Sequence, residues 1–434
     1  MSKTPKPADA TGATSGGIGR KHASGVGVAS LCAAASGFLI LFVAARVLSP
    51  ADNAEFLAYW AGLFAVIGVL AGVTAETTRA VGTVAAGQRM TREREPATSS
   101  RGGARVMFSA LIVGAVLAAL VLALGLPFAD QLFSTHGVTI VVLLALTAVL
   151  FSAHAAVAGS LQGRGLWGPF AQLLTLEATF RFTAVLLAAT LSGSLFGIEA
   201  ACLAALGAWV VVLLSSRSAR AAAMSRADIP LGPFLRQTGH ALVSAAASAA
   251  LLVSFPLLVK LTTAPDDYDL AAPLLLAVSL TRAPIMLPLQ AFQGLALTSV
   301  IRARDEGLRA LQRPIMAVIG LGVLGSILAA LVGPRIMLFF GEDYQVNRWV
   351  LAALTLAAAV IALLTLTGTG LLAMGQHRPY AVGWAIGTAA AVACLMLPLS
   401  TEVRCVLALF VGPLLGIGVH ILAISRRSST VTRP

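Results

Sequence analysis

The sequence predicts an all-α polytopic membrane protein, with about twelve transmembrane helices arranged as two six-helix lobes around a central cavity. Composition is the first observation: 58% of the 434 residues are hydrophobic and 11% are charged, whereas soluble domains are about half apolar and about a quarter charged. The second observation is that apolar runs of membrane length recur along the whole chain. The third is that basic residues gather in the short segments between these runs.

The apolar runs define the predicted helices, because a helix needs about 20 apolar residues to cross a bilayer core. The first six runs are 26–47, 54–81, 106–124, 138–159, 168–191 and 195–215. The second six are 241–261, 271–300, 315–332, 350–374, 380–397 and 403–424. No segment between them is polar and long enough to form a soluble domain.

The runs divide the chain into five predicted parts. Residues 1–24 are rich in Ser, Thr, Gly and Pro and predict a disordered cytoplasmic tail. An N-lobe at 25–216 and a C-lobe at 241–425 hold the helices. A cytoplasmic inter-lobe linker at 217–240 joins the lobes, and 426–434 form a second cytoplasmic tail.

Charge orients these helices with both termini in the cytoplasm. Most of the basic residues fall on one predicted side of the membrane, which the positive-inside rule makes the inner side. The basic residues left on the outer side are Arg46, Lys260, Arg335, Arg348 and Arg404. This topology accounts for the net charge of +12. No nucleic-acid partner is expected, because the basic clusters are not interleaved with aromatics on a recognition helix.

The cysteines predict neither a metal site nor a redox site. Cys32, Cys202, Cys394 and Cys405 are far apart and lie within or beside apolar runs. They lack the close spacing of metal ligands, and we interpret them as small core residues. We therefore expect no cofactor.

Short matches relate the two halves of the chain. The matched residues are Pro50 and Asp52 with Pro265 and Asp267, Pro127 with Pro334, and Gly163 and Arg164 with Gly375 and Arg378. All of them fall at equivalent turns of the predicted topology. A six-helix unit used twice in the same orientation is typical of transporters whose halves face each other across a cavity.

Four stretches carry a resemblance to a known family. They are ARVLSPADNAEFLAYWAGLFAVIG, AGSLQGRGLWGPF, SLTRAPIMLPLQAFQGLALTSV and LFFGEDY. In these stretches the chain resembles the polysaccharide-exporter (oligosaccharide-lipid flippase) branch of the multidrug/oligosaccharidyl-lipid/polysaccharide flippase superfamily. The resemblance implies an alternating-access flippase that moves a polyprenyl-pyrophosphate-linked oligosaccharide from the inner to the outer leaflet, for cell-envelope polysaccharide assembly. It also implies the bacterial plasma membrane as the location.

The resemblance implies partners as well as a substrate. These are the polyprenyl-pyrophosphate-linked glycan, membrane lipids, and the glycosyltransferases or polymerase of the same pathway. The drug-exporting branch usually relies on acidic residues in its N-lobe, especially in the first helix, and the first run carries no acid between Val26 and Ala45. That absence favours the sugar-lipid branch.

Six charged residues lie inside the predicted helices: Glu76, Arg79, Glu177, Arg181, Glu199 and Arg282. A charge at the bilayer centre costs about 2.5 to 3.5 kcal/mol, so each one should face protein or water. We interpret Glu199, near the outer end of its helix, as an interfacial acid. His154, His240 and His420 are interpreted as packed or interfacial residues.

Arg282 is the leading candidate for a substrate-binding residue. It lies near the middle of 271–300, just before Pro284, with no acid within one helical turn. Prolines can bend a membrane helix around a cavity, where an unpaired cation could meet an anionic substrate. The structural alternative is a contact with a backbone carbonyl or a distant acid. Gln290 could extend the polar face, although hydrogen bonding in the core explains it equally well.

Two acid–arginine pairs complete the predicted binding set. Arg181 follows Glu177 at i+4 and is too deep in the membrane to snorkel easily, so it is either a cavity arginine available to phosphate or part of a structural ion pair. Arg79 follows Glu76 at i+3 near the inner end of its helix. That second pair is either a polar cavity wall or a membrane anchor.

The predicted protein is not an enzyme, and no catalytic residue is assigned. One alternative is an ion-coupled small-molecule exporter of the same superfamily, which would use an unpaired acid in the cavity. Another is a membrane glycosyltransferase or polymerase acting on polyprenyl-linked sugars. Such enzymes usually need a large extracytoplasmic loop with catalytic acids, and the predicted outer loops are short.

The predicted topology can be tested with reporter fusions. We expect fusions at Thr98, Ala222 and Arg309 to report the cytoplasm and fusions at Asp267 and Glu342 to report the outside, because of the distribution of basic residues. Reporter activity normalised to protein level is the measurement. A reproducible outside signal from Ala222 would contradict the two-lobe arrangement.

Overall fold

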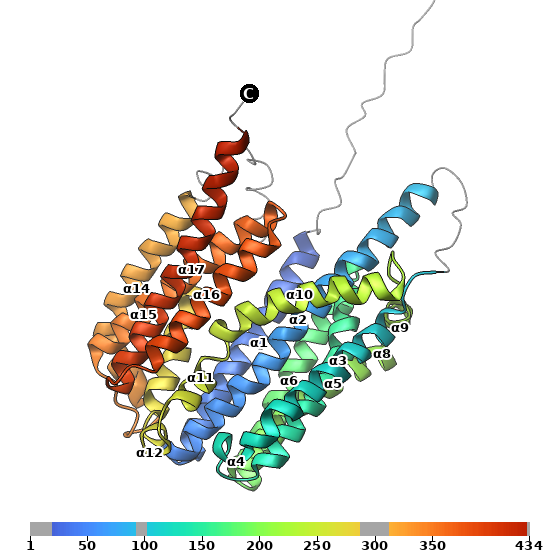
Figure 1. Ribbon diagram of the computed structural model, residues 1–434. Coiled ribbons are helices and arrows are strands. Elements are labelled where there is room, and N and C mark those ends of the chain that lie inside the picture. The colour runs from blue at the N-terminus through green and yellow to red at the C-terminus, as the bar shows by residue number, and fades with distance from the viewer. Residues whose placement is uncertain (1–19, 93–101, 287–311, 432–434) are drawn as a thin grey trace, which may run out of the picture.

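The computed structural model describes residues 20–92, 102–286 and 312–431, and its ribbon is shown in Figure 1. Within these ranges the regular structure is helical. They contain no β-strand, and one isolated β-bridge joins Arg105 and Arg226. The predicted all-α fold class is therefore confirmed. In a bilayer this is the expected outcome, because a helix satisfies its backbone N–H and C=O groups internally.

The first half of the chain forms a group of long helices joined by short turns. The long helices are α1 (Arg20–Val47), α2 (Pro50–Arg92), α3 (Val106–Gly125), α5 (Gly137–Gly163) and α6 (Trp167–Leu191). The short elements are η1 (Leu126–Phe128), α4 (Ala129–Leu132), α7 (Leu195–Ala201), η2 (Cys202–Gly207) and α8 (Ala208–Ser215). Cys202 is buried here, as predicted, whereas Cys32 is exposed.

The second half repeats the pattern of long helices and short turns. Its elements are α9 (Arg217–Ala223), α10 (Leu231–Leu252), α11 (Phe255–Thr262), α12 (Pro265–Asp269), the helix Ala272–Met286, α14 (Gln312–Leu338), α15 (Arg348–Ala373), α16 (His377–Leu395) and α17 (Thr401–Val431). The predicted linker 217–240 thus holds α9 and the first part of α10.

Among the described residues, nine helices are long and apolar enough to cross a membrane, or ten if the bent pair α10 and α11 is one span. The protein is therefore a multi-pass membrane protein. Two predicted runs fall outside this set: 380–397 lies on α16, and 271–300 begins on the helix Ala272–Met286 and continues beyond the described residues. The total of twelve remains a prediction.

The predicted span 241–261 is not one straight helix in the structure, because α10 and α11 are bent by 68° where they meet. In an unbroken helix, the carbonyl of Leu252 would accept from the N–H of the residue four positions later. That residue is Pro256, which has no N–H. Proline in the first turn of α11 therefore permits the break and leaves the Leu252 carbonyl without its helical donor.

The turns at the predicted inner side of the two halves have equivalent conformations, but the residues that correspond to each other differ from the predicted ones. Gly165 follows α5 and Gly375 follows α15, and both have φ of +72°. This left-handed conformation after a helix end suits glycine, which has no Cβ. Gly375 therefore matches Gly165 in structure, and the predicted match with Gly163 is wrong by two residues.

Helices α2 and α10 bring the two halves together. In Figure 1, α14 to α17 lie on one side of the molecule, α3, α5, α6 and α8 lie on the other, and α1, α2 and α10 run between them. A Cβ at Gly72 would lie 2.7 Å from the backbone carbon of Ala241, and one at Gly68 would lie 2.8 Å from the Ala249 Cβ. Small residues thus let the two backbones touch.

The halves also meet at the end predicted to face outside. The Asn53 side-chain amide donates to the Tyr344 hydroxyl at 2.8 Å, and the Tyr268 hydroxyl donates to the Ala54 carbonyl at 2.8 Å. The ring of Phe42 packs edge-on against Phe340. Burial raises the pKa of Tyr344 to about 12, so its hydroxyl stays neutral at physiological pH.

Candidate functional site

A cavity of about 490 Å³ lies between elements of the two halves. Phe38 of α1 and Trp60 and Phe64 of α2 form its aromatic side. The facing wall comes from the junction of α10 and α11, from the helix Ala272–Met286 and from α15. Its lining is apolar except for a few groups, and Arg282 is the charged side chain among the described lining residues.

Arg282 thus lines an inter-lobe cavity, and the substrate-binding role predicted for it remains a prediction. Its Nη1 donates to the carbonyl of Leu252 at 2.9 Å. This is the carbonyl that Pro256 leaves without a donor, so the predicted structural alternative, a carbonyl contact, is also present. The guanidinium lies 5.3 Å from the Phe255 ring centroid, within the range of a cation–π contact.

Arg282 still has donors to offer. Its Nε and Nη2 are buried, and neither has a hydrogen-bond partner in the part of the chain that the structure describes. Buried N–H groups are nearly always paired, so an unpaired donor beside a cavity is notable. An arginine presents its five N–H groups in a rigid fork that matches the oxygens of a phosphate or carboxylate. The arrangement can therefore accept an anionic group.

Arg181 belongs to a buried triad in the first half. Its Nη2 lies 2.8 Å from Glu177 Oε1, which confirms the predicted ion pair, and the other carboxylate oxygen of Glu177 lies 3.3 Å from His154 Nε2. His154 is 3% exposed and stacks on Phe151. One carboxylate on α6 therefore holds an arginine of its own helix and a histidine of α5.

The triad contacts the cavity wall through an aromatic ring. The guanidinium of Arg181 lies 5.1 Å from the centroid of Phe64, which lines the cavity. Arg181 itself is 8% exposed and does not line the cavity. The binding role predicted for Arg181 and Glu177 therefore remains a prediction, and in this arrangement it would require Phe64 to move.

His154 was not assigned a role from the sequence. The sequence does contain a signal for the contact between His154 and Glu177. Both residues lie on the inner halves of consecutive predicted helices that are joined by a short turn. Adjacent antiparallel helices bring such positions to a similar depth. A polar residue at matching depth on each of two neighbouring helices predicts a contact, because a lone ionisable group there would be costly.

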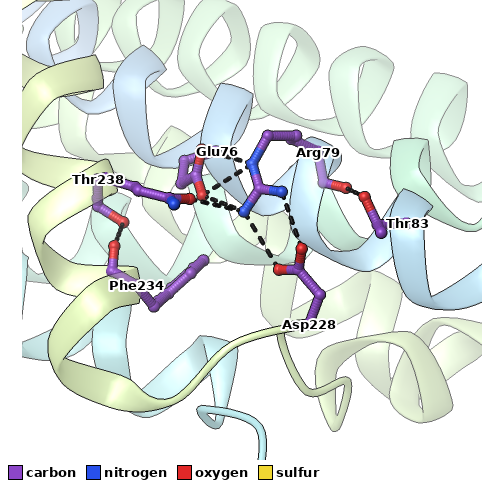
Figure 2. Close-up of polar contacts among 7 residues, drawn as sticks. Glu76, Arg79, Thr83, Asp228, Phe234 and Thr238 are labelled. Carbon is purple, nitrogen blue, oxygen red and sulfur yellow. Dashed lines mark hydrogen bonds and ion pairs between the residues drawn. The ribbon is translucent and has the colours of Figure 1, made fainter.

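The Glu76–Arg79 pair serves a different contact. Figure 2 shows Arg79 between Glu76 of its own helix and Asp228, which precedes α10. The Arg79 Nη2 lies 2.6 Å from Glu76 Oε1, its Nη1 lies 2.9 Å from Asp228 Oδ2, and its Nη2 also donates to Gln237 of α10 at 2.9 Å. Arg79 therefore ties the inner half of α2 to α10 and to the segment before it.

Neither Glu76 nor Arg79 lines the inter-lobe cavity, and their role in substrate binding remains a prediction. Gln290, the last predicted binding residue, lies outside the described residues.

Glu199, which the sequence predicts near the outer end of its helix, is enclosed by protein in the structure, and its interfacial depth remains a prediction. Its side chain is 1% exposed, and its Oε1 is buried without a hydrogen-bond partner among the described residues. The hydroxyl of Tyr59 donates to the Glu199 backbone carbonyl at 2.8 Å. The second buried acid of this region, Glu55, is satisfied, because its carboxylate accepts from the backbone N–H and the hydroxyl of Ser134. Position near a helix end did not reveal that α7 is covered by α2 and α6.

The triad predicts a pattern of stability. The single variants Glu177→Gln and Arg181→Gln should each lower the free energy of unfolding by about 3 to 5 kcal/mol, because each leaves a buried charge without its partner. The double variant should be less destabilised than either single variant. Thermal unfolding of purified protein in one detergent is the measurement.

A control for this series is Glu402→Gln, which removes an exposed acid and should leave stability within about 0.5 kcal/mol of the parent. If the double variant is no more stable than the single variants, the pairing does not explain why these charges are tolerated.

Comparison with known proteins adds the family and the fold. No protein-family model matches the chain. The uncharacterized protein Rv1510 of Mycobacterium tuberculosis (strain ATCC 25618 / H37Rv) is 35% identical over 419 residues, 96% of this chain and 95% of that protein. The uncharacterized protein Rv3630 of the same strain is 35% identical over 432 residues, 98% of this chain and 96% of that protein.

Solved structures with similar folds are transporters. An inward-facing multidrug resistance MATE family transporter of the MOP superfamily gives a TM-score of 0.67 at 16% identity, over 91% of this chain and 95% of that one. A MOP superfamily transporter from Pyrococcus furiosus Vc1 (DSM3638), described by a reverse polarity of its binding pocket that suggests a different function, gives 0.65 at 16% identity, over 96% and 98%. The chain thus has a MATE-like transporter fold, and it belongs to one family with the mycobacterial proteins Rv1510 and Rv3630.

Proposed function

We propose that this protein is an alternating-access transporter that moves a polyprenyl-pyrophosphate-linked oligosaccharide from the inner to the outer leaflet of a bacterial plasma membrane. The observation that carries the proposal is Arg282, a cation on the cavity wall with two buried and unpartnered donors. A pyrophosphate carries fixed negative charge whichever sugar is attached. A cavity that recognises it through an arginine can therefore tolerate different sugars.

The chemistry of the cavity supports an anionic amphiphile. An arginine–phosphate contact can be bidentate, and a low-dielectric site strengthens it. The aromatic rings of Trp60 and Phe64 contact each other at a centroid distance of 4.7 Å, with their planes tilted by 43°, and line the opposite wall. Aromatic faces bind the apolar faces of sugars and the start of a prenyl chain, so both parts of the substrate find a suitable surface.

The polarity of the site argues against a cationic drug as the substrate. A MOP superfamily transporter from Pyrococcus furiosus is described by a reverse polarity of its binding pocket that suggests a different function. In the present chain the charge on the cavity lining is positive. A cation would be repelled by Arg282, whereas a phosphate would pair with it.

Arg282 also offers a way to link binding to conformational change. Its contact with the Leu252 carbonyl lies at the bend between α10 and α11. A phosphate that draws the guanidinium toward the cavity competes with this carbonyl. Substrate binding would then loosen the bend, and α10 contacts α2 of the other half. The proposed cycle needs such a link between the cavity and the lobe contacts.

No enzymatic role is proposed, since this cycle breaks no covalent bond. Glycosyltransferases or a polymerase of the same pathway would supply and consume the substrate.

Arg282→Gln should abolish flipping of a fluorescent polyprenyl-pyrophosphate sugar in reconstituted vesicles, because no cation remains for the headgroup. Arg282→Lys should keep part of the activity, as a point charge without the planar fork. Transport is normalised to correctly folded protein. Full activity of Arg282→Gln would remove the residue from the site.

A matched control is Arg404→Gln. Arg404 is also a partly buried arginine that donates to backbone carbonyls, those of Thr262 and Leu395, but it lies away from the cavity. It should keep transport near the parent level for the same amount of folded protein. Loss of transport in both variants would mean that carbonyl capping, and not the cavity charge, explains the effect of Arg282→Gln.

A second candidate function is an ion-coupled exporter of small molecules, and Glu199 favours it. An ionised carboxylate buried without a partner is costly, and a group in that position can exist protonated. A buried acid that gains and loses a proton as the protein opens and closes is a simple means of coupling.

Under this second function, Glu199→Gln should abolish transport driven by an imposed proton gradient and leave the protein folded, because it resembles the neutral acid. The exposed acid Glu402 provides the control variant Glu402→Gln. Vesicle transport with and without the gradient is the measurement. Gradient-dependent transport at the parent rate in Glu199→Gln would exclude this residue as the carrier.

A further inference from the structure

A second hollow lies away from the inter-lobe cavity, between α10 and the turn that joins α15 to α16. Its volume is about 600 Å³, and it shares no lining residue with the cavity that Arg282 lines. The charge distribution of the sequence puts this turn at the inner face of the membrane. We call the hollow the α10–α16 groove and define it by His240 and Ser244 of α10 and by Gln376, His377 and Arg378 at the start of α16.

The polar lining of the groove is basic. His240, His377 and Arg378 are exposed, and none of them has a hydrogen bond or ion pair with the residues that the structure describes. The described residues that line the groove include no acid. In fact α10, α15 and α16 contain no Asp or Glu at any position. The donors therefore line a hollow whose described lining residues carry no negative charge.

The backbone adds to the same polarity. Gly375 turns the chain in the left-handed conformation, so α16 begins inside the groove with Gln376 as its N-cap residue. No side chain caps the first N–H groups of this 19-residue helix. Free N–H groups and the helix dipole favour an anion at this position. They supplement the three basic side chains, which lie on two separate helices.

Apolar residues continue the groove beyond its basic end. Val243 of α10 lines it and is 62% exposed, and Pro379 and Ala381 line the α16 side. A small soluble anion would make no use of this surface. A lipid would use both parts, with the phosphate at the basic end and an acyl chain along the apolar residues.

We propose that the α10–α16 groove binds the phosphate headgroup of an anionic lipid of the inner leaflet. Basic pockets between transmembrane helices on the cytoplasmic side are a general means of binding such headgroups. The groove binds phosphate through the guanidinium of Arg378, the imidazoles of His240 and His377 and the uncapped N–H groups of α16. This inference does not rest on the proposed sugar-lipid substrate or on Arg282.

The location gives the bound lipid a structural effect. Helix α10 packs against α2 of the first half and against α16 of the second. A phosphate held by His240 on one side and Arg378 on the other bridges α10 and α16 and stabilises their contact. The lipid therefore favours the arrangement in which α10 is docked on the second half.

The test compares lipid binding by the full-length protein in nanodiscs of phosphatidylcholine alone and of phosphatidylcholine with phosphatidylglycerol. Native mass spectrometry counts the phosphatidylglycerol molecules that stay bound. Arg378→Gln should weaken the binding of the retained lipid roughly 10- to 150-fold, since a charge-assisted hydrogen bond contributes about 1.5 to 3 kcal/mol and about 1.4 kcal/mol is tenfold. The double variant His240→Gln with Arg378→Gln should lose it completely.

The control variant is Arg348→Gln, which removes an exposed arginine at the start of α15, on the side predicted to be outer. It should retain the lipid like the parent, and the Arg282→Gln variant should too, which separates this site from the transport cavity. Inorganic phosphate is added in a further arm. Displacement of the lipid by millimolar phosphate, or equal lipid retention by the parent and the double variant, would overturn the proposal.

Discussion

The hydrogen bond from Arg282 to the carbonyl of Leu252 is the interaction on which the rest of the site depends. Pro256 deprives this carbonyl of its helical donor, and in a membrane protein such a freed backbone group has to find another partner. An unsatisfied carbonyl in such a place costs several kcal/mol. Arg282 satisfies it, and the broken helix in turn holds a cation at a depth where an isolated charge would be unfavourable.

This mutual dependence explains why a kinked helix and a buried arginine occur together. Each would be costly by itself, and each reduces the cost of the other. One guanidinium N–H is enough for the carbonyl, so two nitrogens are left over. The stabilising role therefore leaves the residue able to bind a ligand, and the same contact places the candidate ligand site beside the 68° bend between α10 and α11.

Helix α10 connects the features that lie outside the cavity. Its first half receives the Arg79 contact through Gln237, its middle lies against α2 at Gly72 and lines the basic groove, and its end carries the carbonyl that Arg282 binds. The sequence predicted most of this segment as a linker followed by an ordinary span. The roles of its residues follow from the helices that pack around it.

Much of the fold could be predicted from the sequence, because membrane helices follow from apolar length alone. The run 195–215 coincides with a span in the structure, and the ion pairs of Arg181 and Arg79 followed from helical spacing. Contacts between distant segments could not be predicted in this way. His154 beneath Glu177, Asp228 beside Arg79 and the covering of Glu199 all depend on which helices are neighbours, and one sequence does not contain that information.

The contact at Gly72 has a mechanical consequence. Where two helices meet through interdigitated side chains, they can shift by changing rotamers, one residue at a time. At Gly72 the backbone of α2 meets the backbone of α10, with no side chain between them to rearrange. The two axes cannot come closer at this level. A movement of one half of the protein against the other that keeps this contact is therefore limited to rolling or sliding of α2 on α10 at Gly72.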